Sequence, residues 1–208
     1  MGRRATTCGP LVNGGADRRR EAALAGHSGD VATARGLLHD PVAGVRATAL
    51  AALARLGAVT KAEVRAALAD DDPAVRQRAC EVSTSVEGVE TVALLGDDDP
   101  RVAEVAAWAL GEQESDAAGV VEALTAMAGN HSDALCREAA VAALGAIGDE
   151  RGLPAILAAT TDKATVRRRA VISLAPFAGP AVDAALEAAM SDRDWQVRQA
   201  AEDLRGTR

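Results

Sequence analysis

The residues most able to do chemistry surround a single tryptophan. Trp108 has Glu104 four residues before it and Glu112 four residues after it. Residues four apart lie on one face of an α-helix, so a helix here would present an indole between two carboxylates. Tryptophan is enriched among the residues that dominate binding energy at protein interfaces. The spacing therefore favours a partner contact at Trp108, with packing against neighbouring helices as the open alternative.

Other reactive side chains lack the spacing that catalysis needs. His27, His39 and His131 are far apart and do not form the i, i+4 pair of a metalloenzyme helix. The hydroxyls at 83–85 have no base near them in sequence, and the run Asp97–Asp99 is most simply a solvated helix cap. No Gly-rich phosphate loop of the required form occurs. We therefore predict no catalytic residue, no metal site, no cofactor and no enzymatic activity.

A repeated helix start organises the rest of the chain. In Asp72-Pro73-Ala74-Val75-Arg76, Asp72 is a good N-cap and Pro73 suits the first helical position. The Arg position recurs in steps of 27 to 34 residues, at Arg46, Arg76, Ala103, Arg137, Arg167 and Arg198. A period of this length is typical of a helical solenoid, in which each unit buries its apolar face only against its neighbours. The spacing is irregular around residues 83–96, where we expect a change in stacking.

Each repeat reads as a long helix joined to a shorter one. In the fifth copy Val166, Ala170, Leu174 and Phe177 share one helix face, which predicts the buried side. Shorter amphipathic segments lie between the copies, for example at 120–128, so the unit is helix–turn–helix. Trp108 lies six residues after the apolar position of its own copy, about 240° around the helix, and should point away from the core.

The motif Asp-Pro-x-Val-Arg, followed by Ala-Leu-Gly and often Ile-Gly-Asp, resembles HEAT repeats. The likeness covers roughly residues 30–205, is clearest at 109–112 and 143–149, and is strongest to the subtype first described in phycobilin lyase subunits. It implies an all-α fold, a right-handed α-α superhelix (a HEAT-like solenoid) of about six helix pairs.

The resemblance also implies roles for the charged residues. The signature Arg would pair with a turn Asp in a structural ladder along the solenoid, here formed by Arg46, Arg76, Arg137, Arg167 and Arg198 with carboxylates that include Asp72, Asp99 and Asp162. The signature helices would line the concave surface. The predicted contact residues there are Trp108, Glu104, Glu112, Arg78, Glu138 and Arg168.

Composition and charge narrow the class of partner. The chain has 208 residues, 49% of them hydrophobic and 25% charged, with a net charge of −7. Residues 1–20 carry a net charge of +4, which leaves −11 for the remainder, and an acidic body is a poor partner for a phosphate backbone. No apolar run is long enough to span a membrane, and we expect a cytoplasmic protein. We predict a flexible basic leader at 1–16 and one repeat domain at 17–208, which opens with a degenerate helix at 17–25.

These observations favour a non-enzymatic scaffold that binds another protein or a peptide in its concave groove, rather than nucleic acid or membrane. Two alternatives rest on resemblance. The repeat subtype suggests bilin lyase-like handling of an open-chain tetrapyrrole and its acceptor protein. Trp108, Glu112 and Trp195 resemble the aromatic and carboxylate residues of HEAT-like alkylpurine DNA glycosylases, although that family has Asp in place of Glu112 and a basic groove. We otherwise expect Trp195 to cover the terminal core.

Overall fold

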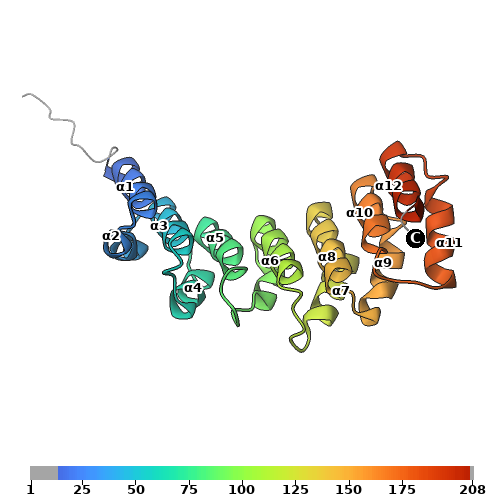
Figure 1. Ribbon diagram of the computed structural model, residues 1–208, viewed down its shortest axis with the longest axis horizontal. Helices are drawn as coiled ribbons and strands as arrows, with labels where there is room; N and C mark the ends of the chain where they lie inside the picture. The colour runs from blue at the N-terminus through green and yellow to red at the C-terminus, as the bar shows by residue number, and fades with distance from the viewer. Residues whose placement is uncertain (1–13, 207–208) are drawn as a thin grey trace, which may run out of the picture. The chain divides into compact units, whose positions relative to one another are not determined.

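The computed structural model describes residues 14–206, and every regular element in that range is helical (Figure 1). Twelve α-helices and three short 3-10 turns occupy the described range, without a strand. The predicted all-α fold of paired helices is confirmed. The predicted leader, 1–16, falls mostly on residues 1–13, which lie outside the described residues. Its boundary at residue 16 falls inside α1, and the single repeat domain at 17–208 stays a prediction.

The chain forms two compact units, divided between Val82 and Ser83, at the start of the stretch with irregular repeat spacing. The first unit contains α1 (Gly14–Ser28), α2 (Val31–Gly36), η1 (Leu37–His39), α3 (Ala43–Arg55), α4 (Lys61–Leu68) and α5 (Pro73–Ser83). The second unit contains η2 (Val92–Gly96), α6 (Pro100–Glu112), α7 (Val120–Asn130), α8 (Ala134–Ile147), η3 (Glu150–Gly152), α9 (Leu153–Ala159), α10 (Ala164–Ser173), α11 (Pro180–Ala189) and α12 (Trp195–Gly206).

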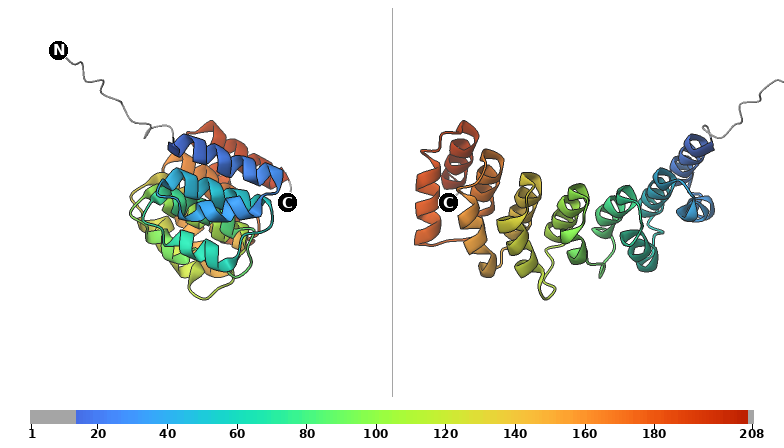
Figure 2. Two further views of the ribbon diagram at one scale, coloured as in Figure 1. Left: turned by 90° about the vertical axis from the view of Figure 1, so that its left-hand side faces the viewer. Right: turned by 180° about the vertical axis from the view of Figure 1, so that it is seen from behind.

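In the first unit the longer helices α1, α3 and α5 lie side by side, and α2 and α4 lie on one side of them (Figures 1 and 2). Helix α2 packs against both α1 and α3. Small side chains dominate the contact, and one buried cluster consists of Ala25, Ala34, Ala52 and Leu53. Alanine pairs let the helix axes approach closely, so a chain with few aromatic residues can still fill its core.

In the second unit the signature helices α6, α8, α10 and α12 pack in sequence as one layer, and α7, α9 and α11 form the other (Figures 1 and 2). The two layers bury between them the large side chains of Leu110, Leu124, Leu144, Ile156, Leu174, Phe177 and Leu186. The predicted inward positions of the fifth copy, Val166, Ala170, Leu174 and Phe177, are all buried. We call the opposite, solvent-facing side of the α6–α8–α10–α12 layer the signature face.

Aspartates cap some of the helices in the way the repeated motif predicts. Asp99 and Asp133 accept hydrogen bonds from the backbone N–H groups two residues on, at the starts of α6 and α8. Helix α3 starts at Ala43 and α10 at Ala164, and neither has a side-chain cap. The carboxylates before these two helices, Asp40 and Asp162, bind arginines and also accept from the backbone N–H groups of Val42 and Lys163.

Two glycines of the Ala-Leu-Gly motif mark the places where neighbouring signature helices touch. A Cβ added at Gly111 of α6 would lie 2.9 Å from the Cα of Ala143, and one added at Gly145 of α8 would lie 2.8 Å from the Cα of Ser173. Any side chain there would push the helices apart. Gly26 of α1 meets Ala52 of α3 in the same way in the first unit.

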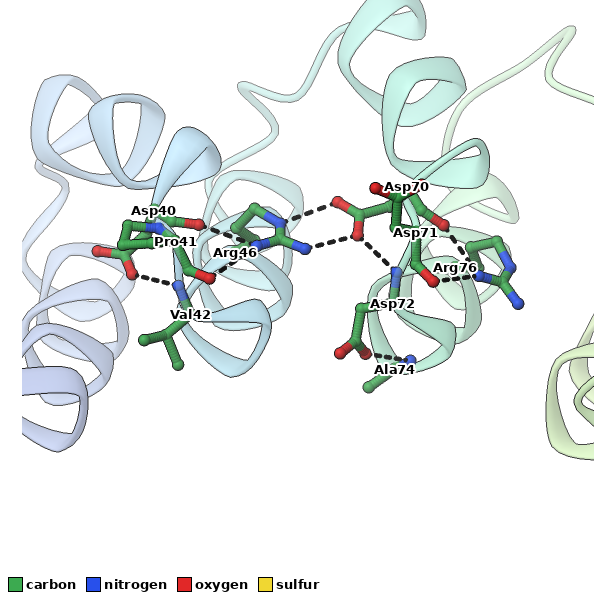
Figure 3. A network of polar contacts seen from close by, with 9 residues as sticks. All are labelled: Asp40, Pro41, Val42, Arg46, Asp70, Asp71, Asp72, Ala74 and Arg76. Carbon is green, nitrogen blue, oxygen red and sulfur yellow. Dashed lines mark hydrogen bonds and ion pairs between the residues drawn. The ribbon is translucent and has the colours of Figure 1, made fainter. Parts of the chain in front are cut away.

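Arginine–aspartate pairs fasten successive repeats to one another. In the first unit Arg46 of α3 donates to both carboxylate oxygens of Asp70, at 2.9 and 2.6 Å, and a third N–H donates to the backbone carbonyl of Asp40 (Figure 3). Arg18 of α1 makes the equivalent pair with Asp40, at 2.5 and 3.2 Å. Arg18 lies 28 residues before Arg46, within the range of the repeat spacing, so α1 is a regular repeat helix rather than a degenerate one.

The second unit repeats this geometry twice. Arg137 donates to both oxygens of Asp162 at 2.7 and 2.8 Å, and Arg167 to both oxygens of Asp192 at 2.8 and 2.7 Å. Arg167 is buried, with 5% of its surface exposed. A third N–H of Arg167 donates to the backbone carbonyl of Asp162, so one guanidinium joins two turns. Bidentate pairing uses the planar fork of arginine and leaves no open anion site at these positions.

Two of the predicted ladder carboxylates have a different role. Asp72 and Asp99 accept from the backbone N–H groups of Ala74 and Arg101. The partner of Arg46 is Asp70, two residues before the capping Asp72, because the repeat has an Asp-x-Asp turn whose first carboxylate reaches back to the preceding repeat. The two remaining predicted arginines donate to backbone carbonyls of the turns. Arg76 donates to those of Asp70 and Asp71, and Arg198 to that of Asp192.

A paired guanidinium stabilises the charged form of each aspartate that binds an arginine of the ladder. The hydrogen-bonded arginine therefore lowers the pKa of Asp40, Asp70, Asp162 and Asp192 below its ordinary value. A group with a lowered pKa contributes stability above the pKa of the unfolded chain, about 3.9 for Asp, and that contribution disappears as the pH falls through the folded value.

The close approach at Gly145 predicts an unusual response to alanine. Gly145→Ala should lower the free energy of unfolding by about 1–3 kcal/mol because the new methyl group overpacks the contact between α8 and α10. Gly129→Ala is the matched control, since it lies exposed in α7 with open space around it, and it should raise that free energy by up to about 1 kcal/mol. Chemical denaturation measures both, and a stabilising Gly145→Ala would contradict the packing.

The buried pair predicts a large cost for one arginine and almost none for the next. Arg167→Ala leaves Asp192 without its partner and should cost about 3–5 kcal/mol at pH 7, whereas exposed Arg168→Ala should change stability by less than about 0.5 kcal/mol. The difference between wild type and Arg167→Ala should shrink as the pH falls from about 5 towards 2, because Asp192 becomes protonated. Equal costs for the two variants, or a cost independent of pH, would contradict the assigned role.

Candidate functional site

Trp108 lies on the signature face with 43% of its surface exposed, so it points away from the core as predicted. It lines an open groove of about 560 Å³ between α6 and α8, which we call the Trp108 groove. Alanines of α8 face this groove, among them Ala139, Ala142 and Ala146, and exposed Leu135 lies at its edge. Small residues on α8 thus leave room beside a large indole on α6.

Carboxylates surround the indole. Glu104 and Glu112 of α6 line the groove together with Glu138 of α8, and among residues 14–206 the one cationic residue that lines it is Arg169 of α10. Arg169 lies 3.4 Å from Glu138, a longer and weaker contact than those of the paired arginines. Four of the six predicted contact residues therefore share one groove.

Glu104 is partly buried beside other acidic groups. Burial, followed by repulsion from Asp133 and Glu138, raises the pKa of its carboxyl. Burial and the charges of Asp133 and Glu104 also raise the pKa of the buried Cys136 thiol to about 11. Acidic groups at the start of α8 and on α6 therefore act on both Glu104 and Cys136.

The other predicted contacts lie elsewhere. Arg78 belongs to α5 in the first unit, where it forms an ion pair with Glu81. Arg168 lines a second hollow of about 480 Å³ between α10 and α12, together with Ile172 and Trp195. The neighbouring Arg169, not Arg168, contacts Glu138. Helical spacing places both arginines on the outward side of α10 and does not distinguish between them.

The expected role of Trp195 is wrong. Trp195 is the first residue of α12 and 64% of its surface is exposed, so it does not cover the terminal core. Leu186 and Val197 are buried at this end of the chain. Trp195 and Trp108 line different hollows, which separates two of the residues that resemble a base-excision site.

Neither a candidate metal-ion cluster nor a candidate membrane span occurs among the described residues. Among residues 14–206 there is no cluster of three or more His, Cys, Asp or Glu side chains that could hold a metal ion. Within the same range no helix has the length and apolar character needed to cross a membrane. The Trp108 groove combines an apolar wall with unneutralised carboxylates, which is suited to holding an apolar group that carries a positive charge.

A comparison with protein families finds one match, the model for HEAT repeats, over residues 89–175. That segment lies in the second unit, from the segment before η2 to the turn after α10. No curated protein sequence matches the chain.

Solved structures resemble the fold. The Escherichia coli protein YibA aligns with a TM-score of 0.63 at 15% identity, over 97% of this chain and 75% of that one. A designed armadillo repeat protein in complex with the peptide (KR)4 aligns with a TM-score of 0.53 at 17% identity, over 96% of this chain and 95% of that one. Human deoxyhypusine hydroxylase aligns at 19% identity with a TM-score of only 0.48, over 94% and 80% of the two chains. The first two likenesses agree with the family match on an armadillo-like or HEAT-like helical repeat fold.

Proposed function

We propose that this chain is a non-enzymatic interaction scaffold, which binds a segment of a partner protein in the Trp108 groove. The observation that carries the proposal is the exposure of Trp108 beside an open, alanine-lined hollow. An indole on the surface exposes apolar area to water, which is unfavourable, and it does not stabilise the core. Tryptophan is a frequent hot-spot residue when a partner covers it.

The designed armadillo repeat protein, which has a similar fold, was solved with a peptide bound. That likeness supports the view that stacked helix pairs can present a peptide-binding surface, and it leaves the residues involved to be argued from this chain. We further propose that the repeats are of the phycobilin-lyase HEAT-like subtype, on the strength of their Asp-Pro-x-Val-Arg and Ala-Leu-Gly motifs. The cytoplasmic location stays a prediction.

The two alternatives have less support. Trp108 and Glu112 share a groove, as a base-excision site would require, but three carboxylates against one guanidinium disfavour a phosphate backbone. No feature of the described residues specifically favours a tetrapyrrole. Binding of a polypeptide makes use of both the apolar wall and the charges of the groove.

An unbiased selection tests the proposal. A displayed library of random peptides, about twelve residues long, is selected on the wild-type protein, and enriched peptides are titrated against Trp108→Ala. We expect affinity to fall at least about 10-fold, in the range of hot-spot losses, since the indole supplies much of the apolar contact.

Trp195→Ala is the matched control, because it removes the other exposed indole, which lines a different hollow. It should change affinity less than about 2-fold. Circular dichroism should show the same helical content in both variants because both side chains are exposed. Failure to enrich any peptide, or equal losses in the two variants, would contradict binding at the Trp108 groove.

A further inference from the structure

The charges of the Trp108 groove specify the chemistry of its occupant. Among the described residues no ion pair is formed by Glu104 or Glu112, whereas Asp162 and Asp192 of the same unit are each paired with an arginine. Arg169 makes only the 3.4 Å contact with Glu138. The groove thus holds three carboxylates and one guanidinium, a net charge of −2.

The position of Glu104 makes this imbalance costly. Its side chain is partly buried against α8, and the groups that act on it from that helix, Asp133 and Glu138, are both acidic. Burial and repulsion raise the pKa of Glu104, so its charged form is disfavoured in the free protein. An external cation beside Glu104 and Glu138 would offset the repulsion between these two carboxylates.

The apolar part of the groove fits the stem of a long cationic side chain. The indole of Trp108 forms one wall, and Ala139 and Ala142 line the groove from α8. Lysine and arginine bury their methylene stems along apolar surface while the charged head stays in a polar setting. A cation over an indole face is also attracted by the ring quadrupole.

We infer that the segment bound in the Trp108 groove is basic, with Lys or Arg side chains that lie along the indole of Trp108 and place positive charge beside Glu104, Glu112 and Glu138. This inference rests on the proposed function and names the partner's chemistry at the same site. An acidic segment is repelled, and a neutral segment leaves Glu104 without a counter-charge.

Three fluorescein-labelled peptides test the inference. They share a flexible Gly/Ser backbone and differ only in three side chains, which are Arg and Lys in the first, Gln in the second and Glu in the third. Fluorescence anisotropy should show at least about 10-fold tighter binding of the basic peptide than of the Gln peptide, no binding of the Glu peptide, and weaker binding of the basic peptide at higher salt.

Two double variants of equal net charge test whether the basic peptide is attracted by the carboxylates of the groove or by the overall charge of the protein. Glu104→Gln with Glu112→Gln should weaken binding of the basic peptide at least about 10-fold. Glu122→Gln with Glu187→Gln removes two carboxylates on α7 and α11, away from the groove, and should change binding less than about 2-fold. Equal losses in both double variants would show non-specific attraction and overturn the inference.

Glu104→Gln alone gives a second readout. It should raise the thermal unfolding temperature of the free protein at pH 7, because it removes a disfavoured charge, and weaken binding of the basic peptide at the same time. A purely structural role for Glu104 predicts a lower unfolding temperature, and that result would overturn the inference.

The outcomes separate the inference from the function on which it rests. Trp108-dependent binding of the Gln or Glu peptide, as tight as that of the basic peptide, would overturn the inference and leave the scaffold function in place. Absence of Trp108-dependent binding for all three peptides and for the selected library would overturn both.

Discussion

The architecture depends on the bidentate contact between the arginine of one signature helix and the aspartate in the turn that precedes the next. Arg46 with Asp70 in the first unit, and Arg167 with Asp192 in the second, join successive repeats at the same point of the motif. Both oxygens of the carboxylate and two N–H groups are used, which fixes the orientation of the planar groups as well as their distance. A buried pair of this kind is costly to break from one side, so it holds each helix in register with its neighbour.

The same pairing decides which charges remain for function. Arginines committed to the ladder cannot receive an anion, and three carboxylates of the second unit, Glu104, Glu112 and Glu138, line the groove beside Trp108. The close contact at Gly111 and Gly145 supports this arrangement, because small residues let α6, α8 and α10 pack closely and leave a shallow alanine-lined groove beside the indole. The close contact between Gly111 and Ala143 thus also forms part of the floor of the candidate binding site.

Much of the fold could be predicted from the sequence. In each repeat a capping Asp indicates the helix start, the apolar period indicates the buried positions, and recurrence of the motif gives the spacing. The outward direction of Trp108 followed from helical period alone. The periodicity could not distinguish the two aspartates of an Asp-x-Asp turn, so Asp70 was missed as the partner of Arg46. It also could not show that Trp195 is exposed, because this residue begins α12 and so lies outside the periodic pattern. Arg18 had a detectable signal in its spacing, although the weak amphipathicity of its helix obscured it.

The central claim is that the indole of Trp108 and the carboxylates around it form the contact surface for a basic segment. The most direct measurement is the pair of indole N–H signals in a ¹H–¹⁵N NMR spectrum, assigned with Trp195→Phe and followed while the basic peptide is added. The account predicts that the Trp108 signal shifts to saturation while the Trp195 signal stays in place. A shift of Trp195 alone, or two unchanged signals at saturating peptide, would contradict it.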